Sequence, residues 1–285
     1  MHLTSVALSL LLAGCSTSSD RSATPSVTPT FTVQPSASPT MVHTPSPSPS
    51  GGSSPTPSRT ATRSPSPSST RPPTSSPHAA AAVAIWRGQT SRRLVALTFD
   101  AGSDVGHTQQ VLDLLKAKGV RASFGLTGVW VRANPSLARR IVTDGHQVVN
   151  HTDRHLSFTG RSTGTAPLTR AQRTEALAAA ESSIRSITGT SALPWFRPPY
   201  GDRDAGVDRD VGAAGYRYEL MWTVDTLGWK GVPPAEVTSR VLNAATPGEI
   251  VLMHVGTAST DWQALADVID GLRAKGYGFV RADAF

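Results

Sequence analysis

The stretch His146-Gln-Val-Val-Asn-His151-Thr-Asp-Arg-His155 carries two histidines, His151 and His155, four residues apart directly after a short apolar segment. Residues four apart share one side of a helix or helical turn, so both imidazoles can face the same point. Neutral imidazole suits Zn²⁺ and similar divalent ions. A single H-x-x-x-H arises often by chance, so its interpretation as a metal site depends on the rest of the chain.

Four further segments place polar side chains at or near the ends of predicted strands. They are Leu97-Thr-Phe-Asp100, Arg197-Pro-Pro-Tyr200-Gly, Asp225-Thr-Leu-Gly-Trp229 and Leu252-Met-His254. In barrels built from alternating strands and helices, polar groups that follow strands gather at the C-terminal rim. The five segments together therefore predict one site.

Taken in this order, the segments resemble the motifs of the polysaccharide deacetylase family, the NodB-homology domain of carbohydrate esterase family 4. The family motifs T-F-D-D-G, H-[ST]-x-x-H, R-x-P-Y, D-x-x-x-W and L-x-H correspond to segments beginning at Thr98, His151, Arg197, Asp225 and Leu252. Four motifs match, and the resemblance covers residues 86–285. The first motif departs from the pattern because Ala101 stands where the family carries the aspartate that completes its metal triad.

The resemblance implies a divalent metal ion, Zn²⁺ before others, bound by His151 and His155. Catalytic zinc usually has three protein ligands and a water molecule, so a third ligand is needed. Asp104 in the loop after the first motif is the first candidate and His107 is the second. Asp104 has an alternative role as the N-cap of a helix that begins near His107.

The resemblance also assigns the catalytic roles. Asp100 would be the general base and His254 the general acid that protonates the leaving amine. Asp225 would pair with His254 and favour the imidazolium, and Arg197 would hold Asp100 ionised. Each of these side chains has a structural alternative, such as a loop cap or a structural ion pair.

Two aromatic residues complete the expected site. The backbone N–H of Tyr200, with the metal, would stabilise the oxyanion. Trp229 would stack on a sugar ring, although a tryptophan beside a strand is also a common core residue.

From Trp86 onward, short apolar runs alternate with longer amphipathic runs, which predicts repeated βα units and an α/β fold. Val95–Phe99, 121–127 and 249–253 are predicted strands, and Thr169-Arg-Ala-Gln172 is a capping box at the start of a helix. The resemblance implies a distorted (β/α)7 barrel. A doubly wound open sheet is the alternative that periodicity leaves open.

The N-terminal part has a different composition. The apolar run 3–12 ends in Leu12-Ala13-Gly14-Cys15, which resembles a bacterial lipobox, although no Lys or Arg precedes it. We expect a signal peptide over residues 1–14 and lipidation of Cys15, the only cysteine of the chain. Residues 15–85, rich in Ser, Thr and Pro, predict a disordered linker because they have too little apolar surface to form a core.

The formal net charge of +7 does not predict a nucleic-acid partner. Residues 16–85 contain four arginines and one aspartate, which leaves +4 for the folded part and no basic cluster in it. We expect a monomer whose partners are a glycan polymer and, through the lipid at Cys15, a membrane.

The sequence thus predicts an exported, lipid-anchored enzyme that faces the cell wall or periplasm and removes N-acetyl groups from an N-acetylhexosamine polymer, with peptidoglycan the first candidate. Acetyl-xylan and chitin oligosaccharides are alternative substrates, because the same motifs serve them. A pseudoenzyme that binds wall glycan without catalysis is the alternative of a different class, since Ala101 removes a metal ligand.

Overall fold

The computed structural model describes residues 80–102 and 104–285, and these residues form one sheet of nine parallel strands. The strands are β1 (Val83–Ile85), β2 (Leu94–Ala101), β3 (Ser123–Leu126), β4 (Gln147–Asn150), β5 (Trp195–Phe196), β6 (Tyr218–Leu220), β7 (Val224–Asp225), β8 (Glu249–His254) and β9 (Gly278–Phe279). Their order is β1-β6-β5-β4-β3-β2-β8-β7, and β9 pairs with β2.

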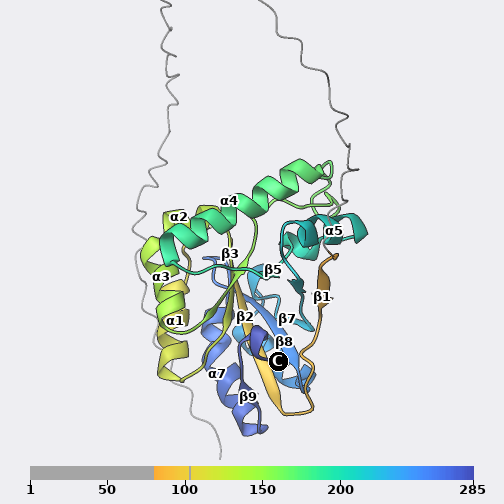
Figure 1. Ribbon diagram of the computed structural model, residues 1–285. Coiled ribbons are helices and arrows are strands. Elements are labelled where there is room, and N and C mark those ends of the chain that lie inside the picture. The colour runs from red at the N-terminus through yellow and green to blue at the C-terminus, as the bar shows by residue number, and fades with distance from the viewer. Residues whose placement is uncertain (1–79, 103) are drawn as a thin grey trace, which may run out of the picture. The chain divides into compact units, whose positions relative to one another are not determined.

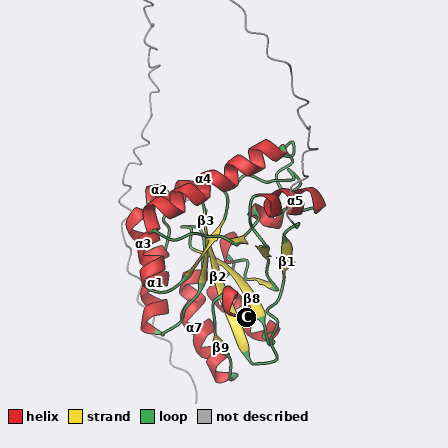
Figure 2. Ribbon diagram, in the orientation of Figure 1, coloured by secondary structure: helices red, strands yellow, loops and turns green. Residues whose placement is uncertain are grey.

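The helices lie around the outside of this sheet (Figures 1 and 2). They are α1 (Thr108–Ala117), α2 (Gly128–Ala133), α3 (Pro135–Thr143), α4 (Arg170–Thr188), α5 (Ala205–Ala213), α6 (Pro234–Ala244) and α7 (Asp261–Ala274). Contacts run from α5 through α4, α3, α1 and α7 to α6, so the helices follow one another around the sheet. Three short 3₁₀ turns span Pro199–Gly201, Gly228–Lys230 and Ala282–Ala284.

This arrangement confirms the predicted distorted (β/α) barrel. From β6 to β2 the neighbours in the sheet follow the chain in sequence, and the strand order does not reverse between them as it does in a doubly wound sheet. The polar ends of several strands therefore meet at one rim.

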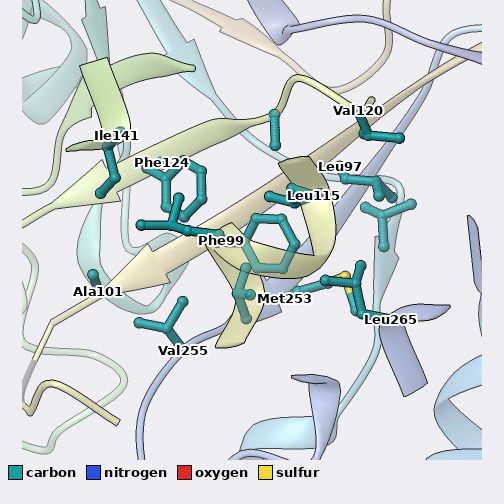
Figure 3. Packing of buried hydrophobic residues seen from close by; sticks show 14 of the residues in the cluster. Leu97, Phe99, Ala101, Leu115, Val120, Phe124, Ile141, Met253, Val255 and Leu265 are labelled. Atoms are coloured by element: carbon teal, nitrogen blue, oxygen red, sulfur yellow. The ribbon is translucent and has the colours of Figure 1, made fainter. Parts of the chain in front are cut away.

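Side chains alternate between the two faces of each strand, and this alternation decides what reaches the interior. On β2, Leu97, Phe99 and Ala101 belong to the apolar cluster between the sheet and the outer helices (Figure 3). The intervening Thr98 and Asp100 therefore point inward. The interior below them is filled by a smaller cluster, made of Ala96, Val149, Leu220, Ile250 and Ala282.

Several local predictions agree with the structure. Thr169 caps α4, and its capping box with Gln172 is present. Asn134 is the N-cap of α3 with Pro135 in the first turn, but its side chain donates a hydrogen bond to the Trp130 carbonyl (3.0 Å) instead of capping α3. The helix α2 was not predicted, because its six residues are too short to show a helical period.

The boundary of the folded part lies earlier than residue 86. Val83–Ile85 form β1 and pair with Tyr218–Leu220 of β6, because the run Ala-Val-Ala-Ile offers the apolar residues that a strand needs. The expected signal peptide, Cys15 and most of the expected linker lie outside the described residues. Within residues 80–102 and 104–285, no helix combines the length and the apolar character needed to cross a bilayer.

Candidate active site

A cavity of about 810 Å³ opens at the C-terminal ends of the strands. Its walls come from the ends of β2 and β8 and from the loops after β4, β5 and β7, and the lining residues include Asp100, His155, Tyr200, Trp229 and His254. The structure therefore brings residues of all five sequence motifs to one place, as the motif order predicted.

Asp100 is held by an arginine at the bottom of this cavity. The carboxylate is 7% exposed, and its Oδ1 accepts a hydrogen bond from Nη1 of Arg197 at 2.8 Å. Nη2 of Arg197 donates to the Thr98 hydroxyl (2.9 Å) and Nε to the Leu220 carbonyl (2.8 Å), so the guanidinium is fixed on three sides. Burial raises the pKa of Asp100, but the charge and the hydrogen bond of the Arg197 guanidinium act against it, and the pKa falls to about 2.

The approach of Asp100 to its neighbours depends on a glycine in the adjacent strand. Gly125 pairs with Asp100 in the register of β2 and β3. A Cβ atom at position 125 would overlap Oδ1 of Asp100. Gly125 therefore leaves room for the carboxylate.

His151 presents a bare nitrogen to Asp100. Its Nδ1 lies 2.8 Å from the Arg197 carbonyl, which only accepts, so Nδ1 carries the proton and donates it. Burial lowers the pKa of His151, which favours the neutral ring. Its Nε2 is buried without a hydrogen bond, 3.4 Å from Oδ2 of Asp100.

His155 lies beside His151, but not on a helix. The ring centroids of the two histidines are 4.7 Å apart, and the Tyr200 ring lies 4.7 Å from His155 on its other side. Residues 151–155 form a loop in which Thr152 and His155 have positive φ angles of 66° and 56°. The expected helical turn is therefore wrong, although the two rings do meet. Burial lowers the pKa of His155 to about 3, so this imidazole is also neutral.

The two histidines provide part of a binding site for a divalent cation. A metal-binding histidine typically donates its second ring N–H to a carbonyl or carboxylate, as His151 does to Arg197, and offers the bare nitrogen to the metal. The third family position is not a ligand here, because Ala101 is fully buried in the apolar cluster (Figure 3). Among the residues that the structure describes, no group of three His, Cys, Asp or Glu side chains is arranged to hold a metal.

Both candidates for the third ligand are engaged elsewhere. Oδ1 of Asp104 accepts hydrogen bonds from the backbone N–H and the hydroxyl of Thr257, both at 2.9 Å, although Asp104 lines the same cavity as His155. Asp104 is not the N-cap of α1, since His107 occupies that position without a side-chain cap. His107 stacks on Trp262, with ring centroids 4.8 Å apart.

His254 and Asp225 both line the cavity but do not pair with each other. Oδ1 of Asp225 accepts from the backbone N–H of Leu227 (2.9 Å) and from the indole N–H of Trp229 (3.2 Å). The expected ion pair between Asp225 and His254 is therefore wrong. Instead, the backbone N–H of His254 donates to Oδ2 of Asp261 at 2.8 Å.

Exposed aromatic rings form part of the rim. Trp229 is 45% exposed and lines the cavity, as does Tyr200, so neither belongs to the core. The amide of Tyr200 lies in a turn whose φ of 60° is in the left-handed region.

Thr98, Gly125 and Asp261 are the functional positions that sequence reasoning missed. Thr98 stands inside the first motif and Asp261 seven residues after His254, but neither belongs to a pair or spacing that signals chemistry. Thr98 and Gly125 meet their partners through strands that are distant in sequence, whereas Asp261 meets the His254 backbone because the turn after β8 leads into α7. Only Gly125 carried a signal, as a glycine inside a strand pattern marks a close approach.

Comparisons with known proteins agree with this geometry. Residues 87–219 match the family model for polysaccharide deacetylase. Over 204 residues the chain is 31% identical to the peptidoglycan-N-acetylmuramic acid deacetylase PdaA of Bacillus subtilis, which covers 70% of this chain and 74% of that protein.

A second relative is considerably longer than this chain. The peptidoglycan-N-acetylglucosamine deacetylase PgdA of Listeria monocytogenes is 33% identical over 207 residues, and the match covers 73% of this chain but 41% of PgdA. The chain thus spans less than half of that relative.

Among solved structures, a carbohydrate esterase family 4 pseudoenzyme of Bacillus anthracis superimposes with a TM-score of 0.64 and 29% identity, covering 71% of this chain and 68% of that protein. The fold, the motifs and the sequence matches agree, and the chain belongs to the polysaccharide deacetylase family, the hydrolases of carbohydrate esterase family 4.

Proposed function

We propose that this protein is a metal-dependent deacetylase that hydrolyses N-acetyl groups of peptidoglycan. The observation that carries the proposal is the inward-facing Asp100, fixed by Arg197 at 2.8 Å, in the same cavity as His155 and His254. Amide hydrolysis requires a base that accepts the proton of water and an acid that protonates the leaving amine. The cavity offers a candidate for each.

Asp100 is an ionised but weak base. With a pKa of about 2, its carboxylate is charged at every working pH, since it titrates well below neutrality. Taking a proton from ordinary water, whose pKa is about 15.7, would be strongly unfavourable, and a bound divalent metal lowers that pKa to about 7. Asp100 can therefore serve as the base only if a metal activates the water.

We assign His151 and His155 as the protein ligands of this metal. Both imidazoles are neutral because burial lowers the pKa of each, and Nε2 of His151 has no hydrogen bond. Asp104 is the remaining candidate for a third ligand, since it lines the same cavity. With Ala101 in the family's ligand position, we expect weaker binding than three protein ligands give.

His254 is the proposed general acid, at the end of β8. A proton on its ring would pass to the amine nitrogen of the sugar as the amide bond breaks. Asp225 has a different proposed role. Its carboxylate accepts a hydrogen bond from the indole N–H of Trp229 and so holds this ring in the wall of the cavity. The exposed faces of Trp229 and Tyr200 would stack on sugar rings, and the Tyr200 amide is the proposed oxyanion donor.

The choice of peptidoglycan rests on a cation at the rim and on the two named relatives. Among the described residues that line the cavity, Arg154 is the only Lys or Arg, and its side chain is 77% exposed. Its neighbour Asp153 is already held by Arg132 at 2.7 Å, which leaves most donors of Arg154 available. Peptidoglycan carries carboxylates that an arginine can bind, whereas chitin and acetyl-xylan do not.

The proposed cellular place follows from the substrate and from the N-terminus. A protein that acts on the cell wall must be exported, and we propose that the lipid at Cys15 anchors it to the membrane while residues 15–85 give it reach. In this proposal, residues 80–285 are the catalytic domain, and the protein acts as a monomer.

A wall-binding pseudoenzyme is the second candidate, favoured by Ala101. The Bacillus anthracis pseudoenzyme shows that the family contains such proteins, and a mutant of it is described as having restored enzymatic activity. An inactive chain with an intact cavity would still bind glycan.

Replacement of the proposed base tests the mechanism. Asp100→Asn should lower kcat by about 100-fold or more, because a positioned acid or base contributes about 10²–10⁴-fold. Glycan affinity should stay within about twofold, measured by calorimetry on the same preparation. Asp113→Asn, an exposed change on α1, is the matched control. Full turnover in Asp100→Asn would contradict the assignment.

A further inference from the structure

The proposed general acid lacks the carboxylate partner that its motif implied. Nδ1 of His254 is buried and has no hydrogen bond within the described part of the chain. Asp225 is committed to Trp229 and Leu227. The group that supports His254 must therefore be found elsewhere in the site.

Asp261, the first residue of α7, is fully buried beneath His254. Its Oδ2 accepts hydrogen bonds from the backbone N–H of His254 (2.8 Å) and from the hydroxyl of Ser259 (2.9 Å). Its Oδ1 is buried with no hydrogen bond of normal geometry among the described residues, although the nearby Thr226 hydroxyl acts to lower the pKa of this carboxyl group. A buried carboxylate with an unused oxygen is costly, so its retention beside His254 calls for an explanation.

The loop that carries Trp229 is shaped around the same carboxylate. A Cβ atom at Gly228 would overlap Asp261 Oδ1, so this position has room only for glycine. The Gly228 carbonyl also accepts a hydrogen bond from the amide of Thr260 at 3.2 Å. The Asp261 side chain thus lies where three segments meet: the loop after β7, the end of β8 and the start of α7.

We propose that Asp261 is the positioning residue of His254, and that its carboxylate orients this histidine and favours the imidazolium in place of Asp225. The inference rests on the proposed function, in which His254 is the general acid. Asp261 does not touch substrate. Among the described residues its carboxylate binds the His254 backbone N–H and forms no ion pair with the ring, so it would act through the backbone and through its charge at longer range.

Other titratable groups face His254 and set the background for any pH effect. They are Asp100 at the end of β2, His151 and His155 in the loop after β4, and Asp225 after β7. Asp100 remains ionised down to a pH of about 2, so it contributes a constant charge in the working range. Burial raises the pKa of Asp261, which makes its own titration part of the test.

The experiment compares Asp261→Asn with the native chain in two readouts. Loss of the negative charge should lower kcat by about tenfold or more with KM changed less than about twofold, since proton transfer and not binding is affected. The high-pH limb of the rate profile should move down by roughly 0.5–1 pH unit, because the imidazolium is less stabilised. Asp270→Asn, an exposed change on the same helix, is the matched control.

NMR titration of the His254 ring gives the second readout, which needs no turnover. Its midpoint should move to lower pH in Asp261→Asn, even if the native chain releases no acetate and the proposed function fails. If Asp261→Asn does not fold, Ser259→Ala removes one donor from the same carboxylate and should move the limb and the midpoint to higher pH, and an unchanged midpoint in this variant would contradict the proposal. A folded Asp261→Asn with the native profile and the native midpoint would overturn the proposal.

Discussion

Asp100 and Ala101 are neighbours in sequence and lie on opposite faces of β2. Asp100 points into the cavity and binds Arg197, whereas Ala101 packs with the apolar cluster between the strands and the helices (Figure 3). Position 101 also distinguishes this chain from the family motif that it resembles, because alanine stands where that motif has an aspartate.

Restoring that acid should therefore have two measurable effects. In chelator, Ala101→Asp should lower the free energy of unfolding by about 2–4 kcal/mol, because a carboxyl group enters an apolar cluster without partners. Zinc should raise the melting temperature of this variant more than that of the native chain, since a metal bound by His151 and His155 would draw the added carboxylate out of the apolar cluster as a third ligand.

A second buried alanine provides the control for this prediction. Ala138 in α3 belongs to the same apolar cluster but is remote from the cavity. Ala138→Asp should be destabilised without any added response to zinc. Equal zinc shifts in the native chain and in Ala101→Asp would contradict the identification of position 101 as the missing ligand position.

Residue identities in the five motifs were predictable because each motif is continuous in sequence. One contact between motifs was expected, because the resemblance has Arg197 hold Asp100. Others were not predicted: strand register brings Thr98 to Arg197 across 99 positions, and the start of α7 brings Asp261 to the His254 backbone. A motif of a few residues does not show which strands and helices lie side by side in the fold.

At the scale of elements, the loop 151–155 shows how side chains override a helical spacing. The amide of Thr152 donates to the Asn150 side chain (2.8 Å), and the amide of His155 donates to the Thr152 hydroxyl (3.1 Å). Such local bonds offer the backbone an alternative to a helix. The four-residue spacing therefore predicted correctly that the two rings are close together, but the backbone that brings them together is a loop and not a helical turn.

The opposite end of β8 carries a buried acid that makes stability depend on pH. Glu249 is fully buried, and burial raises its pKa from 4.5 to about 7. A carboxyl group whose folded pKa is raised contributes stability that is present below pH 4.5 and is lost as the pH rises through 7.

Glu249→Gln should accordingly stabilise the protein only at higher pH. We expect the free energy of unfolding to rise by about 1–3 kcal/mol at pH 8.5 and to change little at pH 4, where the native carboxyl is protonated in both states. Urea denaturation at the two pH values measures this. Glu175→Gln on α4, where the side chain is exposed, is the control and should show no such difference. An equal effect of Glu249→Gln at both pH values would contradict it.

At the scale of the whole molecule, the alternation of short apolar and longer amphipathic runs was enough to predict a barrel of strands and helices. The period fixes which faces are buried, and this decides the layers. It did not place β1, because Val83–Ile85 are too few residues to show a period. Very short strands such as β5 and β7 also lack a period to detect.

Acetate release from a peptidoglycan digest by the purified full-length protein, before and after chelation and after zinc is restored, decides whether the chain is a metal-dependent deacetylase. We predict release that chelation abolishes and zinc recovers, and that is faster on peptidoglycan than on a neutral chito-oligosaccharide. Glycan binding without acetate release at any zinc concentration would contradict it and identify the chain as a pseudoenzyme.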